Sequence, residues 1–489
     1  MKTLKQKTFS GVTWQMGGKI LQKGISVATF AILARILQPS AFGLFALAFT
    51  AMDGLHIFKS FGLDTALIQR KDETGEITHT AFFIVQGSGI LLCGVCYFMA
   101  PLAALFFHNQ EITSVIRALG IIFIFSGFSK IPSTLLAKEM RFSVLSMIDL
   151  IGGVVNCVAA VGFALISPTI WSLVWAYVLK QLTIALITRQ FSGFRIQWCF
   201  SFQRAKELIH FGKFMVGLNL LWYFGGNLNN IVAGKMLGVV ALGYYALAAN
   251  IGNFINTHFT VLLESVMFPA YSSLQHDSED VKRAYFKTTK YVSVISIPFG
   301  VASILLAKEF VMTVYGVKWL EIVPLMQTFG AMQLLIPLSV CSGSLFLGCG
   351  RPGYQFNLTL YPLLARIPAL ILLTRLWGLQ GVVLSEVMIL ALSAPIHVAL
   401  VQKIVRFSYR EFFIQFLPSI YCSIFMAVAL VMLKGLVASL PFSLAVFHHF
   451  ILLLIYSLAG LSVYVAAYSL IDRSAVLEVG RLIFKLEGA

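Results

Sequence analysis

The chain has 489 residues, of which 58% are hydrophobic and 11% are charged, and its mean hydropathy is +0.87. A soluble core of this size could not bury so much apolar surface, so lipid must be the main solvent. A net charge of +16 is also found in nucleic-acid-binding proteins, but here the basic residues lie mostly in short breaks between apolar runs. This placement is typical of a membrane protein, and we expect no nucleic-acid partner.

Apolar stretches long enough to cross a bilayer recur along the whole chain. At roughly twenty apolar residues per crossing, they predict an all-α polytopic membrane protein with about fourteen transmembrane helices. The short basic run at the N-terminus lacks the compact apolar core and cleavage site of a signal peptide, so we expect the first helix to stay in the protein. The predicted spans are 8–34, 42–62, 78–105, 112–136, 143–166, 170–190, 207–234, 239–264, 290–308, 320–346, 354–374, 378–402, 412–436 and 446–470.

The basic residues predict how these helices are threaded through the membrane. If the N-terminus is cytoplasmic, the inward segments hold most of the Lys and Arg, among them Lys71, Arg141 and Arg204. Few lie in the outward segments, such as Arg117 and Lys308. Because cytoplasmic loops carry the excess of Lys and Arg, we expect both termini to be cytoplasmic.

The chain repeats itself at a distance of six helices. LARILQPSAFGLFALA around Arg35 is echoed by AGKMLGVVALGYYALA around Lys235, and ALIQRKD is echoed by SSLQHD one helix later in each half. An even spacing makes both halves enter the membrane in the same direction. We therefore expect two six-helix bundles, residues 1–200 and 201–404, related by a parallel repeat with substrate between them. Residues 405–489 would add two C-terminal helices and a cytoplasmic tail. The alternative is that small-residue turns look alike by chance.

Polar stripes run along the first two helices of each half. Helical spacing places Lys19 and Lys23 on one face of the first helix, and Asp53 and His56 on one face of the second. Charged groups inside a bilayer ordinarily face a partner or a water-filled cavity, so we predict a polar cavity between the halves. Two alternatives stay open: the asparagines bond to neighbouring helices, and the lysines reach the membrane surface. The candidate cavity residues are Gln15, Lys19, Lys23, Asp53, His56, Lys59, Lys180, Asn219, Asn227, Asn250, Asn253, Glu264, Arg366 and Glu386.

The predicted cavity is modestly more cationic than anionic, because its lysines and Arg366 outnumber its carboxylates. Such a cavity suits a substrate that bears pyrophosphate or uronic acid. Arg366 lies between Pro362 and Pro368 and is predicted to line the cavity or to act at a hinge. The alternative is that it packs against Glu386.

The sequence carries no motif of an enzyme. It lacks a phosphate loop, an HExxH pair and a nucleophile elbow, and its loops are short. Cys93 and Cys96 have the spacing of a redox or metal pair, but no second pair or histidine cluster accompanies them, so we predict a structural role. We expect no catalytic residue, no metal site and no cofactor. A coupling ion, H+ or Na+, is left open.

Several segments of the chain, in their order and spacing, resemble one transporter family. They are TFSGVTW, LARILQPSAFG, FGLDTALIQRKD, AKEMRF, NLNNIVAGKMLG, FPAYSSLQHD and GVKWLEIVPLMQ. With them the chain resembles the Wzx-type polysaccharide flippases of the multidrug/oligosaccharidyl-lipid/polysaccharide superfamily, most closely the WzxC-like colanic acid and related exopolysaccharide exporters. The resemblance implies two six-helix bundles that form a V in the bacterial inner membrane and open alternately to either side. One departure is that relatives often carry an aspartate where this chain has Asn227 to Asn230, which puts ion coupling by the seventh helix in doubt.

The resemblance also implies a substrate and partners. The substrate would be an undecaprenyl-diphosphate-linked oligosaccharide repeat unit that is moved from the cytoplasmic to the periplasmic leaflet. The lysines of the predicted cavity indicate that this repeat unit is acidic. Membrane lipids are expected partners, and a polysaccharide polymerase or other assembly proteins are further candidates. Amphipathic segments at residues 69–76 and 275–290 are candidate gating elements or lipid contacts, or else plain solvated loops.

Two other functions stay open. A multidrug exporter of the same superfamily, driven by a cation gradient, would prefer an acidic cavity, which Lys19 and Lys23 disfavour. A membrane glycosyltransferase or polymerase would need a domain with clustered acids, bases or metal ligands, and the loops are too short for one.

Overall fold

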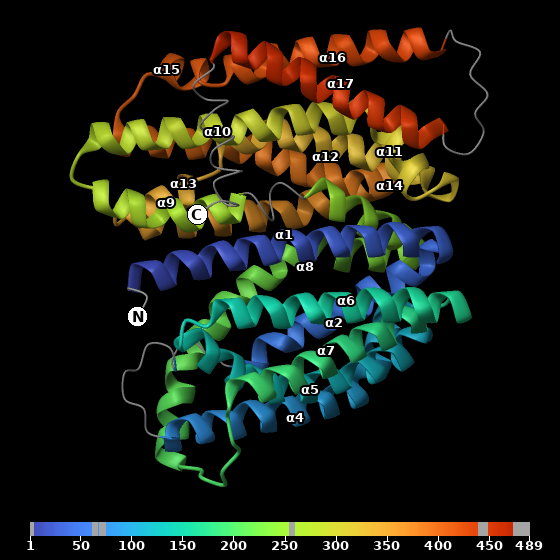
Figure 1. Cartoon of the computed structure of the whole chain (residues 1–489), viewed down its shortest axis with the longest axis vertical. Coiled ribbons are helices and arrows are strands. Elements are labelled where there is room, and N and C mark those ends of the chain that lie inside the picture. The colour runs from blue at the N-terminus through green and yellow to red at the C-terminus, as the bar shows by residue number, and fades with distance from the viewer. Residues whose placement is uncertain (1–3, 61–66, 68–74, 254–259, 439–447, 473–489) are drawn as a thin grey trace. The chain divides into compact units, whose positions relative to one another are not determined.

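The computed structural model describes residues 4–60, 67, 75–253, 260–438 and 448–472. Over these ranges the chain forms helices and no strand, which confirms the all-α prediction (Figure 1). The helices up to residue 252 are α1 (Leu4–Ile36), α2 (Pro39–Ser60), α4 (Gly75–Phe107), α5 (Glu111–Lys138), α6 (Phe142–Ile166), α7 (Ile170–Ser192) and α8 (Phe202–Gly252). They are followed by α9 (Val261–Leu274), α10 (Ser278–Leu305), α11 (Ala307–Val314), η2 (Val317–Ile322), α12 (Val323–Leu335), η3 (Ile336–Leu338), α13 (Ser342–Gly348), α14 (Pro352–Val405), α15 (Tyr409–Ile414), α16 (Leu417–Ala438) and α17 (His448–Ile471).

Many of these helices suit a lipid environment. Among the described residues, 11 helices are long and apolar enough to cross a membrane. The total of fourteen crossings stays a prediction. The chain also divides into two compact units, one reaching Gly243 and the other starting at Tyr244. The predicted bundle boundaries at residues 200 and 404 stay predictions.

The two longest helices each contain a tight turn. α8 is interrupted at Gly238, with φ at 82°, and α14 at Gly378, with φ at 56°. Both angles lie in the left-handed region, which glycine enters without strain. A Cβ added to Gly381 would collide with the carbonyl oxygen of Leu373, whereas a straight helix would separate residues eight apart by about 12 Å. The chain therefore folds back within α14, between the predicted spans 354–374 and 378–402.

The two copies of the repeated segment contact each other inside the first unit. A Cβ added to Gly43 in α2 would collide with the carbonyl oxygen of Val239, and one added to Gly243 would collide with that of Pro39. Positions 39 and 43 correspond to 239 and 243 in the repeat. The contact is therefore reciprocal, as contacts around a two-fold axis are. This reciprocity supports the internal repeat.

We expect the Gly43→Ala variant to be less stable than the natural chain, although alanine favours a helix. The added methyl group has no space beside Val239, and overpacking costs about 1–3 kcal/mol. Gly24→Ala in α1 is the matched control, because nothing lies within 4 Å of a Cβ added there; it should be neutral or stabilise by up to about 1 kcal/mol. Denaturant unfolding of the purified variants measures both, and an equal response would contradict the contact.

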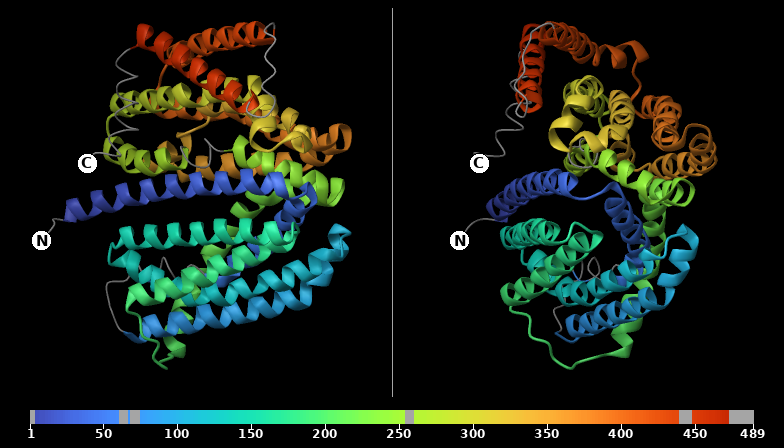
Figure 2. Two further views of the ribbon diagram at one scale, coloured as in Figure 1. Left: turned by 45° about the vertical axis from the view of Figure 1, so that its right-hand side comes forward. Right: turned by 90° about the vertical axis from the view of Figure 1, so that its right-hand side faces the viewer.

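Small residues allow the helices of the first unit to pack closely. Gly89 of α4 lies against the Phe123 carbonyl of α5, and Gly127 of α5 lies against Gln86 of α4. α5 also packs on α7, so α4, α5 and α7 run side by side (Figures 1 and 2). Such contacts are typical of membrane helices, whose association depends on van der Waals packing.

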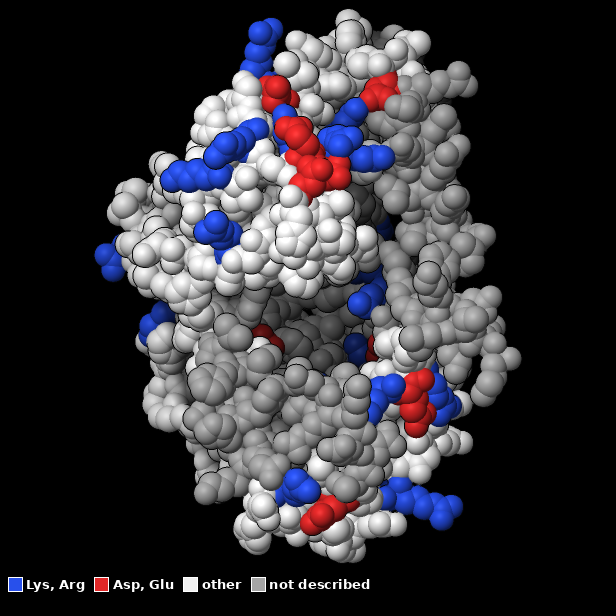
Figure 3. Space-filling view, turned by 90° about the vertical axis from the view of Figure 1, so that its left-hand side faces the viewer, with Lys and Arg blue, Asp and Glu red and all other residues white. Residues whose placement is uncertain are grey.

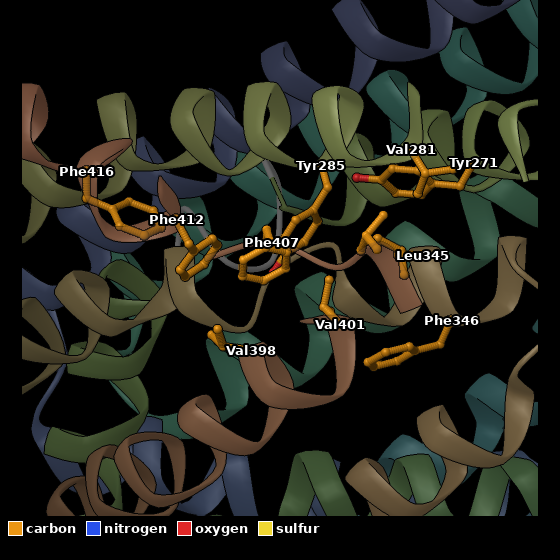
Figure 4. Close-up of a cluster of buried hydrophobic side chains, with 11 residues drawn as sticks. Tyr271, Val281, Tyr285, Leu345, Phe346, Val398, Val401, Phe407, Phe412 and Phe416 are labelled. Atoms are coloured by element: carbon orange, nitrogen blue, oxygen red, sulfur yellow. The ribbon is translucent and has the colours of Figure 1, made fainter. Parts of the chain in front are cut away.

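An aromatic core lies in the second unit, where α10 meets the connection from α14 to α15. Tyr285 of α10 stacks on Phe412 of α15 with ring centroids 5.9 Å apart. Phe407 packs on Phe412 at 5.6 Å. Figure 4 shows these rings beside Val398 and Val401 of α14. The core therefore fixes the end of α14 on α10.

The start of α10 differs from the prediction. A span was predicted from residue 290, with an amphipathic segment before it, but α10 begins at Ser278. Asp277 caps this helix by accepting bonds from the N–H groups of Glu279 and Asp280 at 2.9 and 3.1 Å. Residues 278–290, for which a solvated loop was one alternative, are thus the first turns of a helix that Asp277 caps. In the other predicted amphipathic segment, 69–76, residues 69–74 lie outside the described residues.

The predicted tenth helix, 320–346, is broken in the structure. α12 passes into the short 3-10 helix η3, which contains Pro337. Cys341 then adopts a left-handed φ of 64° before α13 begins at Ser342. Pro337 lacks an N–H group and cannot continue the helical hydrogen bonds. Broken helices at membrane depth are tolerated where other protein groups satisfy the backbone.

Candidate functional site

The first polar cluster lies between α2 and the first half of α8. The Asn227 amide donates to the Asp53 carboxylate at 2.8 Å, and the Asn230 amide donates to the Thr50 hydroxyl at 3.1 Å. The Tyr223 hydroxyl donates to the Thr50 carbonyl at 3.1 Å. The two α2 residues are one turn apart and the three α8 residues share one helix face, which is why they meet. We call these five residues the α2–α8 cluster.

The α2–α8 cluster joins the predicted candidates Asp53 and Asn227. Their bond matches the alternative in which asparagines hold neighbouring helices together. Asp53 nevertheless stays exposed, so its carboxylate can still meet a cation or a proton. The described part of the chain holds no group of three His, Cys, Asp or Glu side chains that could bind a metal ion.

We expect Asn227→Ala to destabilise the protein by about 1 kcal/mol, a usual value for a hydrogen bond between membrane helices. The variant removes the amide that donates to Asp53. Asn219→Ala is the control, because Asn219 lies two turns earlier on the same helix and is exposed. Unfolding of both variants in detergent should show a loss for Asn227→Ala alone, and equal losses would contradict the assignment.

The second polar cluster combines three helices of the first unit. α6 packs on α1 and on α7, and Gly152 of α6 leaves room for Ile184 of α7, the residue one turn after Lys180. The Asp149 carboxylate of α6 interacts electrostatically with the ammonium groups of Lys180 and Lys19. We call these three residues the lysine cluster. Two ammonium groups interact with one carboxylate at longer range than an ion pair, so the cluster is net positive.

Sequence reasoning identified both lysines but missed Asp149. The signal was available, because a carboxylate inside the predicted span 143–166 is as costly as a lysine. Lys180 also lies 5.5 Å from the ring centroid of Tyr177, one helical turn before it. Lys23, one turn after Lys19, is half-buried.

His56 and Lys59 lie near the end of α2. The His56 ring is 5.8 Å from the ring of Phe123 on α5. Lys59 is only 2% exposed, and its carbonyl accepts the Ser88 hydroxyl of α4 at 2.6 Å. Lys59 is therefore enclosed by protein in this conformation. Asn219 is exposed, and the side chain of Gln15 lies outside the described residues.

In the second unit, Arg366 and Glu386 form an ion pair across the two arms of α14. Their charged groups are 2.5 Å apart, and each side chain is 16% exposed. The Tyr245 hydroxyl lies 3.5 Å from the same Glu386 oxygen. The structure thus shows the alternative for Arg366, packing against Glu386. A buried pair of this kind is balanced and less available to an anion than a lone arginine.

Glu264 lies where α9 passes the broken tenth helix. Its carboxylate interacts with the backbone of Cys341. Next to it, the Ser342 hydroxyl lies 2.7 Å from His397 Nδ1. Glu264 therefore lies beside backbone that the break leaves without regular helical partners.

The candidates Asn250 and Asn253 lie before residues 254–259, and Glu264 lies after them. α8 ends at Gly252, Asn253 lies in a turn, and α9 begins at Val261. Asn250 and Asn253 are half-buried. Residues 254–259 lie outside the described residues, so a continuous polar face from Asn250 to Glu264 stays a prediction.

A family model described as polysaccharide biosynthesis protein matches residues 32–324. This chain belongs to that family. It is 23% identical over 425 residues to the lipopolysaccharide biosynthesis protein WzxC of Escherichia coli (strain K12), covering 86% of each chain. It is 27% identical over 327 residues to the succinoglycan biosynthesis transport protein ExoT of Rhizobium meliloti (strain 1021), covering 65% of this chain and 64% of that one. The family resemblance predicted from the sequence is confirmed.

Solved transporters share the fold. The lipid II flippase MurJ, in its inward closed conformation, matches with a TM-score of 0.72 at 14% identity, covering 94% of this chain and 98% of MurJ. An inward-facing multidrug transporter of the MATE family matches with a TM-score of 0.63 at 17% identity, covering 78% of this chain and 94% of that one. The fold is that of the predicted transporter superfamily.

Proposed function

We propose that this chain is a flippase for undecaprenyl-diphosphate-linked, acidic oligosaccharide repeat units in surface-polysaccharide biosynthesis. It moves them from the cytoplasmic to the periplasmic leaflet by alternating access, and acts in the bacterial inner membrane with both termini in the cytoplasm. The observation that carries the proposal is the net positive lysine cluster in a polysaccharide biosynthesis protein with a transporter fold.

The lysine cluster suits an acidic substrate for a physical reason. An ammonium group is a strong and geometrically undemanding partner for a diphosphate or a uronic acid. Without substrate, Asp149 balances part of the charge of Lys19 and Lys180. A bound anion balances the lysines in place of Asp149. The anion therefore binds more tightly to conformations that expose the lysines than to conformations that do not. Transport requires such a difference in affinity.

The proposed flippase needs no enzymatic step and no cofactor. A coupling ion, H+ or Na+, is compatible with the exposed Asp53, whose second carboxylate oxygen is not needed for its bond to Asn227. The same carboxylate favours the second candidate function, a cation-coupled multidrug exporter, because a carboxylate attracts organic cations.

Deletion of the gene in its own host tests the proposed function. A flippase predicts accumulation of complete lipid-linked repeat units on the cytoplasmic side and loss of the surface polymer. Unchanged polysaccharide together with altered tolerance to cationic drugs would overturn the flippase and favour the exporter.

A further inference from the structure

A basic groove lies where the chain leaves α7. Its cavity, about 520 Å³ in volume, lies between the last turns of α7 and the segment that follows. Leu186, Arg189 and Gln190 of α7 form one wall, and Arg195 and Ile196 form the other. We call this cavity the α7 groove. It belongs wholly to the first unit and shares no residue with the lysine cluster.

The chain after α7 is extended and fixed on α4. Gly193, with a left-handed φ of 65°, ends the helix. The following side chains alternate, so Phe194 packs on Phe82 of α4 with ring centroids 5.5 Å apart while Arg195 stays exposed. The N–H of Ser201 donates to the Thr80 hydroxyl of α4 at 3.1 Å. Figure 2 shows this green segment running past α4 to the start of α8. The groove therefore has a fixed second wall.

Arginines give the α7 groove its charge. Arg189 and Arg195 are exposed, and neither forms an ion pair with a residue that the structure describes. Arg141, at the same end of the first unit, donates to the Phe191 carbonyl of α7 at 3.1 Å but pairs with Glu139 at 3.5 Å and does not line the groove. Guanidinium groups bind phosphate oxygens in pairs of parallel hydrogen bonds. The charge of the groove therefore fits a phosphate group.

Apolar side chains around the groove indicate a membrane surface. Leu186 on its wall is 61% exposed, Trp198 in the following segment is 93% exposed, and Phe202, the first residue of α8, is 84% exposed. The Trp198 ring stacks on Phe83 of α4 at 5.2 Å, so it is held in place. Tryptophan is enriched where membranes meet water. Figure 3 views the end of the molecule at which α7 ends, and Lys and Arg side chains, together with Asp and Glu side chains, lie on its lower part.

We propose that the α7 groove binds the phosphate headgroup of an anionic phospholipid in the adjacent leaflet. Arg189 and Arg195 hold the phosphate, and the acyl chains pass along Leu186 into the bilayer. The bound lipid anchors the end of the first unit at the membrane surface. This site goes beyond the flippase proposal, and its test does not depend on transport.

Lipid binding to the purified full chain in detergent tests the site. We expect native mass spectrometry to show tighter retention of phosphatidylglycerol than of phosphatidylcholine. At about 1 kcal/mol per basic residue near a membrane surface, Arg189→Gln/Arg195→Gln should weaken phosphatidylglycerol binding about 25-fold. The single variant Arg195→Gln, at an exposed position, should weaken it about fivefold.

Two controls separate the groove from general charge. Arg189→Lys/Arg195→Lys keeps the charge and should lose less than the glutamine pair. Arg283→Gln/Arg410→Gln removes two arginines elsewhere on the predicted cytoplasmic side, where Arg283 pairs with Asp280 at 2.5 Å, and should bind as the natural chain does. Equal binding by Arg195→Gln and the natural chain would overturn the site. Release of the lipid by equimolar inorganic phosphate would overturn the lipid as its occupant.

Discussion

Neutralising the lysine cluster should reduce transport of acidic repeat units far more than transport of neutral ones. The variant is Lys19→Gln/Asp149→Asn/Lys180→Gln, in which the asparagine avoids leaving a carboxylate without its balancing cations. A hydrogen bond to a charged group contributes about 1.5–3 kcal/mol. Loss of both ammonium groups should therefore raise the half-saturating concentration of an acidic repeat unit at least about tenfold.

Two companion variants sharpen this test. Asp149→Asn alone leaves both lysines and removes the carboxylate that competes with an acidic substrate for them. This variant should therefore bind acidic repeat units as well as or better than the natural chain. Lys308→Gln removes an exposed lysine from the second unit and should change neither substrate. Vesicles that contain each purified variant and receive labelled acidic or neutral repeat units provide the measurement. Equal losses for both substrates would show that the cluster does not select by charge.

Arg366→Ala should be among the most destabilising single substitutions in the second unit. It leaves the Glu386 carboxylate, with 16% of its side chain exposed, without the cation that balances it. Removing one partner of a buried ion pair costs about 3–5 kcal/mol. Denaturant unfolding in detergent measures the loss.

A double variant distinguishes the pair from simple packing. Arg366→Met/Glu386→Leu replaces both charges by apolar groups of similar size and should recover most of the stability, because no charge is left buried. Arg375→Ala, an exposed position on the same arm of α14, should be close to neutral. A double variant no more stable than Arg366→Ala would contradict the ion pair as the cause.

Helix periodicity and the family fragments predicted much of the architecture. The apolar runs gave helices close to their observed limits, such as 143–166 for α6 (Phe142–Ile166). The repeat pairs the segment around Arg35 with the segment around Lys235. Gly43 and Gly243, which are equivalent positions in this repeat, make reciprocal contacts in the structure. These features follow from local patterns along the chain, so they are visible in a single sequence.

The partners of the polar side chains could be predicted only in part. Arg366 and Glu386 were recognised as possible partners because both are costly inside a bilayer. The bond from Asn227 to Asp53 joins residues 174 positions apart, and no periodicity specifies which distant helix face a stripe will meet. The break at Cys341 was missed for a related reason, because the segment around it is apolar enough to be predicted as one span.

Movement of lipid-linked sugar across a membrane tests the central claim most directly. The purified chain would be reconstituted in vesicles that carry an undecaprenyl-diphosphate-linked acidic oligosaccharide, labelled on the sugar. The proposed function predicts that the label crosses from one leaflet to the other faster than in protein-free vesicles, and that Lys19→Gln/Asp149→Asn/Lys180→Gln slows it. Crossing at the protein-free rate, in vesicles where the chain is folded and inserted, would contradict the account.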